Sequence, residues 1–152
     1  MPHRANVSAV AWKPDGRAFV AGTEDGLIEA VEVESGGTLF STGLHSTTVN
    51  SLVWSPDGQR IVSAADDGSI KLLAADGGGD LLTFPLGERA THVAWSPAGN
   101  HLAAATGGGK VHVWDAVRAD ELSEQGDQRP KRNPRIPRRA NVFIHFSIAT
   151  EG

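Results

Sequence analysis

The feature that most constrains this chain is an internal repeat. The pattern Trp-(Lys/Ser)-Pro-(Asp/Ala)-Gly begins at Trp12, Trp54 and Trp95, which gives spacings of 42 and 41 residues. Four further landmarks keep the same register, namely Phe19, Ile61 and Leu102; Gly26, Gly68 and Gly109; Ile28, Ile70 and Val111; and Val31, Leu73 and Trp114. A fixed period of this length is the signature of an architecture whose units stack on one another.

Each unit predicts four short strands separated by turns. In the second unit, the strand-like runs cover residues 49–54, 60–64, 69–73 and 81–84. Turn residues rich in Pro, Asp and Gly separate them, at residues 56–58, 66–68 and 77–79. Each complete unit is therefore expected to be a four-stranded antiparallel meander. Its apolar faces must be buried against neighbouring units, and radial stacking into a β-propeller satisfies this need.

The repeats predict an all-β chain that forms a partial β-propeller of four-stranded antiparallel blades. The chain supplies two complete blades plus three strands of a third, because the expected fourth strand near residues 121–125 reads Glu-Leu-Ser-Glu-Gln and is too polar. We expect the blades to occupy residues 1–118, with units at 3–44, 45–85 and 86–118. Residues 119–152 form a Pro- and Arg-rich tail that we expect to be disordered.

The repeat resembles the Trp-Asp (WD) repeat family of β-propellers over residues 3–118. The resemblance rests on the period, on Trp114-Asp115 at the end of a third strand, on Asp-Gly turns in two units and on His45, which lies nine residues before Trp54. It implies a buried hydrogen-bonded network within each blade. In the family this network joins a His before the first strand, a Ser or Thr on the second strand, an Asp in the following turn and a Trp on the third strand.

Each unit of this chain carries part of that network. Unit two has His45, Ser63 and Asp67, but Leu73 stands in place of the Trp. Unit one and unit three depart further, since Ala21 replaces the Ser or Thr of unit one, and Leu86 and Gly108 replace the His and Asp of unit three. The resemblance therefore implies a structural hydrogen-bond network made from His45, Ser63, Asp67, His3, Asp25, Trp114 and Asp115.

Three candidate sites for ligand chemistry are better explained by the repeat. His92, His101 and His112 lie on expected strands without a metal-binding spacing. The acidic turns 24–26 and 66–68 lack the alternating ligands and distal Glu of a calcium loop. The glycines at 107–109 align with the turns of the other units, and the residues that a phosphate-binding loop requires around them are absent. We expect no metal, no cofactor and no enzymatic activity.

Charge and composition restrict the partners of the chain. Residues 1–115 hold seven Lys/Arg against thirteen Asp/Glu, so this part is acidic and poorly suited to bind nucleic acid. The tail contains six basic residues and three prolines at 129–139, followed by alternating apolar residues at 142–148 that are compatible with a strand. No apolar run is long enough to span a membrane, and no cysteine is present. We therefore expect a cytoplasmic protein.

The number of blades raises the question of how a ring would close. Propellers generally contain about four to eight blades, and an open stack would expose an apolar face and unpaired strand edges. Several chains could complete one ring through self-association, or the stack could persist open. The interpretation we favour from the sequence is that this chain is a fragment of a longer propeller.

The sequence favours a noncatalytic protein-interaction scaffold whose partners are other proteins of unknown identity. One alternative is a regulatory or targeting propeller segment of a larger enzyme. Another is a nucleic-acid-associated protein that acts through the basic tail, although no aromatic residue is interleaved among the basic ones to stack on bases.

Overall fold

The structure is a computed structural model, and it describes residues 5–77, 80–115 and 144–147. The regular elements of these residues are β-strands, which confirms the all-β fold class. In chain order they are β1 (Val7–Trp12), β2 (Ala18–Thr23), β3 (Leu27–Glu32), β4 (Thr38–Gly43), β5 (Val49–Trp54), β6 (Arg60–Ala65), β7 (Ser69–Ala74), β8 (Asp80–Pro85), β9 (Ala90–Trp95), β10 (His101–Thr106), β11 (Lys110–Asp115) and β12 (Ile144–Ser147). The described part of the chain includes no helix that could cross a membrane.

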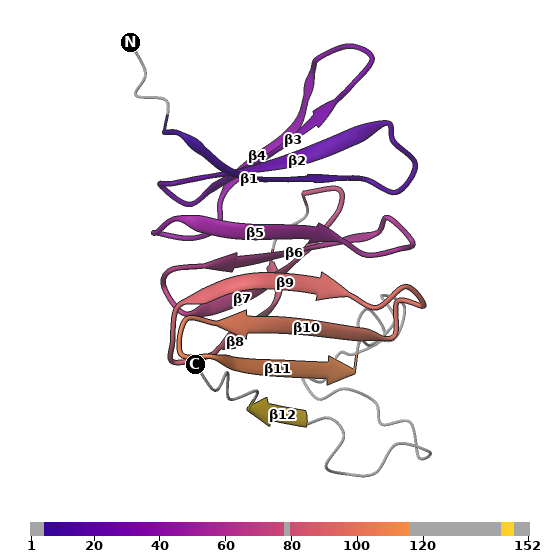
Figure 1. The fold of residues 1–152 in the computed structure, drawn as a ribbon. Coiled ribbons are helices and arrows are strands. Elements are labelled where there is room, and N and C mark those ends of the chain that lie inside the picture. Colours follow the sequence, from indigo (N-terminus) through magenta and orange to yellow (C-terminus); the bar gives the residue numbers. More distant parts are fainter. Residues whose placement is uncertain (1–4, 78–79, 116–143, 148–152) are drawn as a thin grey trace.

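The strands form three separate antiparallel sheets of four strands each. We call them blade 1 (β1–β4), blade 2 (β5–β8) and blade 3 (β9–β12), and within each blade the strands are neighbours in chain order. The three blades are stacked one above another, with blade 2 between the other two (Figure 1). This is the arrangement of consecutive propeller blades that the repeat predicts.

The Pro-Asp-Gly motif makes the tight turn between the first two strands of a blade. In blade 2, Gly58 adopts a φ of 71°, a left-handed conformation that favours glycine, and its N–H donates to the Ser55 carbonyl at 2.9 Å. The Asp57 carboxylate accepts hydrogen bonds from Ser55 Oγ at 2.5 Å and from the Gln59 N–H at 3.0 Å. These contacts fix the turn and the register of β5 against β6.

Each blade has a front face and a back face. We define the front face as the one that carries the repeat tryptophan of the first strand, where Trp54 pairs with Ile61 in blade 2. The back face carries the alternate residues, such as Val62 paired with Leu72. Because side chains alternate along a strand, both faces of a blade are apolar and both need a neighbour.

The core of the molecule lies at the two junctions between blades. At each junction the front face of one blade packs on the back face of the preceding blade. The junction of blades 1 and 2 buries Val20, Ile28, Val49, Leu52, Trp54, Ile61 and Leu73. The junction of blades 2 and 3 buries Val62, Ala64, Ile70, Leu72, Ala90, Val93, Leu102, Ala104 and Trp114.

The first strand of every blade carries an irregularity at the same place. The pairing of each first strand with the second skips one residue, which is Ser8 in blade 1, Asn50 in blade 2 and Thr91 in blade 3. A bulge of this kind redirects the side chain of the extra residue. Ser8 Oγ donates to the Val49 carbonyl at 2.6 Å, and Asn50 Nδ2 donates to the Ala90 carbonyl at 2.8 Å. The bulge residue thus links its own blade to the next one.

Blade 3 differs from the sequence-based expectation of three strands and a wholly disordered tail. Its fourth strand, β12, comes from residues 144–147 and pairs antiparallel with β11 from Lys110↔Ser147 to Val113↔Ile144. The prediction that residues 119–152 lie outside the fold is therefore wrong for these four residues. The physical reason is that the outer edge of β11 offers unpaired N–H and C=O groups, and 142–148 is an alternating segment while 121–125 is polar. The rest of the tail lies outside the described residues.

Candidate functional site: a hydrogen-bonded rim at one end of the blades

One end of the stack is formed by the turns between the second and third strands and by the loops that enter each first strand. We call this end the rim and define it as residues 23–26, 45–48, 66–69, 86–89 and 106–110. The turns and loops interlock between blades, because the Gly26 carbonyl accepts hydrogen bonds from the N–H of Leu44 and the N–H of His45, and the Gly68 carbonyl accepts one from Leu86. The rim is therefore a continuous part of the stack.

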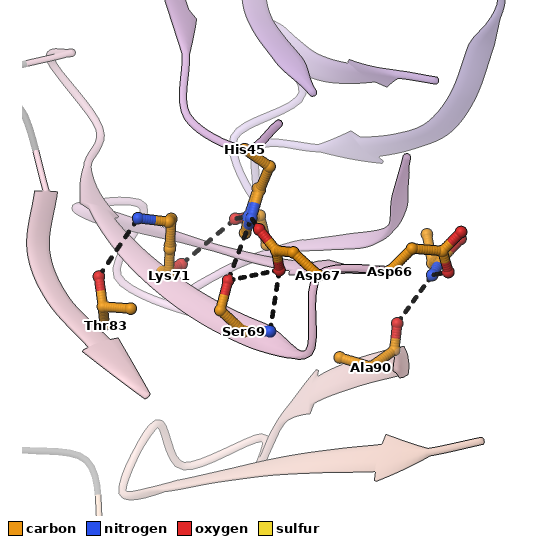
Figure 2. Close-up of polar contacts among 9 residues, drawn as sticks. His45, Asp66, Asp67, Ser69, Lys71, Thr83 and Ala90 are labelled. Atoms are coloured by element: carbon orange, nitrogen blue, oxygen red, sulfur yellow. Dashed lines mark hydrogen bonds and ion pairs between the residues drawn. The ribbon is translucent and has the colours of Figure 1, made fainter. Parts of the chain in front are cut away.

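His45 joins the rim to the interior of blade 2. Its Nδ1 lies 3.0 Å from Asp67 Oδ2, and its Nε2 lies 2.7 Å from Ser63 Oγ (Figure 2). The imidazole side chain has no exposed surface, and Asp67 is 24% exposed. An ionised carboxylate can only accept hydrogen bonds, so the proton of the neutral ring lies on Nδ1. The structure thus brings together the three residues that the resemblance assigns to unit two.

Asp67 is held by the turn that it begins. Its Oδ1 accepts hydrogen bonds from the Ser69 N–H at 2.9 Å and from Ser69 Oγ at 2.6 Å, and Ser69 Oγ also lies 3.2 Å from His45 Nδ1 (Figure 2). Burial raises the pKa of Asp67, but the hydrogen bonds from Ser69 and His45 outweigh it and hold the pKa below its usual value of 3.8. The carboxylate is therefore charged at neutral pH.

The candidate residues of unit one do not form the same network in the described residues. Asp25 is exposed in the turn before β3, and its carboxylate accepts a hydrogen bond from Thr23 Oγ1. Thr23 Oγ1 also accepts the Leu27 N–H at 3.1 Å, so these contacts stabilise the turn. His3 lies outside the described residues.

Trp114 lies in the core and is far from the His45 network in the fold. It is 6% exposed at the junction of blades 2 and 3, where its ring centroid lies 5.2 Å from that of Phe84 and 5.8 Å from that of His112. Asp115 ends β11, where its backbone pairs with His101. Trp114 is therefore part of blade packing, whereas the resemblance assigns it to a hydrogen-bonded network.

Blade 3 has a rim contact that sequence reasoning missed. Glu88 lies in the loop before β9, and its Oε2 accepts a hydrogen bond from Thr106 Oγ1 at 2.7 Å. Lys110 Nζ lies 3.3 Å from Glu88 Oε1. The Thr106 hydroxyl and the Lys110 ammonium lower the pKa of Glu88. This acid connects the loop to the turn as His45 does in blade 2, and it escaped notice because the family pattern directs attention to position 86.

A second group of rim residues ties blade 2 to blade 3. Asp66 Oδ1 lies 3.0 Å from Arg89 Nε and accepts a hydrogen bond from Asn50 Nδ2 at 2.7 Å. Figure 2 shows the Asn50 amide between Asp66 and the Ala90 carbonyl. The Arg89 side chain remains 63% exposed, so its outer part faces solvent. The rim thus presents charged groups whose positions are set by bonds within and between blades.

The arrangement suits binding through shape and charge. Among the residues that the structure describes, no group of three His, Asp or Glu side chains could hold a metal ion. His92 and His101 are exposed and His112 is buried, so these three histidines do not converge. The polar groups of the rim are used to fix turns and junctions, and they leave outward charges on a rigid surface.

Fold and rim together define a stack of β-propeller blades with polar turns at one end. Comparison with family models agrees with this class. The model described as WD domain, G-beta repeat matches residues 36–72 and 83–115, and the model described as anaphase-promoting complex subunit 4 WD40 domain matches residues 2–50. The chain belongs to the WD-repeat family. No curated protein matches it.

Proposed function

We propose that this chain is a noncatalytic protein-interaction scaffold and that a partner protein contacts its rim. The observation that carries the proposal is the organisation of the rim before any partner is bound. Asp66 and Asp67 are both held by hydrogen bonds, and Arg89 is placed by Asp66 while staying exposed. A surface that is already ordered loses little conformational entropy on binding.

Family membership supports this proposal, because WD40 repeats are generally protein-interaction scaffolds. One of the two matching models describes the WD40 domain of a subunit of a complex, which favours a place for this chain within a multiprotein assembly. We further propose that the blades are part of a larger ring, since propellers contain about four to eight blades. A cytoplasmic location remains part of the same proposal.

The test is a comparative capture experiment with the full chain and two matched variants. The rim variant carries Glu24→Arg and Asp25→Arg, two exposed acids of the β2–β3 turn. The control carries Asp15→Arg and Glu34→Arg, two exposed acids at the opposite ends of the strands. Both variants change the charge equally, and circular dichroism checks that both keep their β-sheet content.

We expect quantitative mass spectrometry to find proteins that the chain and the control retain and that the rim variant loses. The same proteins retained by all three forms, or none retained by any, would contradict the proposal. Partners lost by the control alone would move the binding surface to the opposite end of the blades.

A further inference from the structure

The front face of blade 1 has the composition of a junction without a neighbour. Trp12 is 61% exposed, whereas Trp54, the same repeat position in blade 2, is 5% exposed. Val10 is 62% exposed and its counterpart Leu52 is 7% exposed. Contiguous exposed apolar residues of this kind mark a surface that binds another surface.

The back face of blade 3 supplies the other half of such a junction. Ala103 pairs with Val113, and Ala105 pairs with Val111, in the register that Val62–Leu72 and Ala64–Ile70 have on the back of blade 2. The four residues of blade 2 lie beneath blade 3 and are at most 4% exposed. The four residues of blade 3 are half-buried. The same apolar pattern is therefore repeated there with less cover.

The polar contacts of the junctions also have counterparts on the two open faces. Thr91 is the bulge residue of blade 3, and its hydroxyl donates to the Ala105 carbonyl at 3.2 Å, as that of Ser8 does to the Gly22 carbonyl at 3.2 Å. Ser8 in addition reaches the Val49 carbonyl across a junction. By repeat position, the acceptor for Thr91 is the carbonyl of Val7, whose side chain is 65% exposed.

The repeat tryptophan has a polar contact across a junction as well. Trp54 Nε1 donates to the Ala11 carbonyl of blade 1 at 3.1 Å. The equivalent acceptor in blade 3 is the carbonyl of Ala94, on the inner strand whose back-face residue Ala94 is exposed. Trp12 is the donor that matches it.

We propose that the front face of blade 1 packs on the back face of blade 3 of a second copy of this chain, and that two copies close a six-bladed ring. Three blades are described in one chain. Six is the multiple of three that falls within the usual range of about four to eight blades. Each chain then forms half of the ring. The two new junctions are identical, head-to-tail, and leave no apolar face open.

This inference is independent of what the rim binds, and it concerns the 152-residue chain itself. The new junction repeats the existing ones: Trp12 enters the layer of Ala103, Ala105, Val111 and Val113. Its indole N–H points to the Ala94 carbonyl, and the Thr91 hydroxyl points to the Val7 carbonyl. Blades supplied by a longer polypeptide are the competing source of cover for the same faces.

The test is the mass of the full chain in solution, measured by analytical ultracentrifugation across a concentration series. We expect a species of about 32 kDa, twice the 16.0 kDa of one chain. Trp12→Lys alters the front face and Ala105→Glu alters the back face, so each variant alone should sediment at about 16 kDa. Glu34→Lys, in an exposed turn of blade 1, is the control and should keep the larger mass. Circular dichroism checks the fold of each.

Mixing the two variants tests the head-to-tail geometry. Trp12→Lys keeps an intact back face and Ala105→Glu keeps an intact front face, so the mixture should regain a species of about 32 kDa through one intact junction. A chain that stays at about 16 kDa with native circular dichroism would overturn the proposal. A pair that survives both substitutions, a mixture that regains nothing, or an open series of larger species would overturn it too.

Discussion

Replacing Asp67 with alanine removes the acceptor that holds the buried His45 ring. The carboxylate loses its contact with His45 Nδ1 at 3.0 Å and two bonds to Ser69, from the N–H at 2.9 Å and from Oγ at 2.6 Å. His45 keeps Ser63 Oγ at 2.7 Å and Ser69 Oγ at 3.2 Å, so its ring is weakened in its contacts without losing all of them. A buried group that loses a charged partner costs about 1 to 3 kcal/mol.

Asp57→Ala is the matched control for the turn bonds. Asp57 accepts from Ser55 Oγ at 2.5 Å and from the Gln59 N–H at 3.0 Å, which reproduces the local bonds of Asp67 to Ser69 without a histidine. Surface substitutions typically change stability within about 0.5 kcal/mol. We therefore expect Asp67→Ala to cost at least about 1 kcal/mol more than Asp57→Ala, because the difference isolates the His45 contact.

Urea and thermal unfolding of both variants at one protein concentration measure this difference. The concentration is fixed because association changes the apparent stability. At roughly 4 °C per kcal/mol, the Asp67 variant should melt several degrees below the Asp57 variant. Equal midpoints would refute the reasoning, since the His45 contact would then contribute nothing beyond an ordinary turn.

Three further predictions follow from the geometry. The hydrogen-bonded Asp67 has a folded pKa below 3.8, so it adds stability above that pH that is lost as the pH falls through the folded pKa; urea midpoints of the protein and of Asp67→Asn should converge in acid, and a constant gap would contradict this. Gly26→Ala should cost more than about 2 kcal/mol in thermal unfolding, because its Cβ would overlap the His45 carbonyl at a φ of 90°, whereas Gly16→Ala, at a φ of 73° with nothing within 4 Å, should cost about 1 kcal/mol; equal losses would count against the interlocked rim. Phe146→Pro removes an N–H from β12 opposite Val111, so hydrogen exchange of the β11 amides should accelerate, and unchanged exchange would show that β12 does not pair there.

The repeat predicted most of the fold because its signals are local. Expected strands at 49–54, 60–64, 69–73 and 81–84 compare with observed strands at Val49–Trp54, Arg60–Ala65, Ser69–Ala74 and Asp80–Pro85. Proline and glycine mark the turns directly in the sequence, and the alternation of apolar residues sets both faces. The strand β12 could not be located this way, because its partner β11 is distant in sequence and no local signal encodes that pairing.

The rim was predictable where it follows the repeat and unpredictable where a different residue takes over. His45, Ser63 and Asp67 come together because equivalent positions in each unit occupy equivalent places in each blade. Glu88 reaches Thr106 from a position that the pattern does not mark, since its longer side chain spans a gap that a histidine would otherwise fill. Trp114 was assigned to a polar network by resemblance, but its place on the front face puts it in the core.

The central claim is that the chain is a stack of blades in which each front face packs on the back face before it. The most direct measurement is a set of nuclear Overhauser effects from the indole of Trp54, whose Nε1 donates to the Ala11 carbonyl at 3.1 Å and whose ring is 5% exposed. The account predicts cross-peaks from this indole to Ala11 and to Val20 of blade 1, together with slow exchange of its N–H proton. Cross-peaks confined to residues of blade 2, with rapid exchange of that proton, would contradict it.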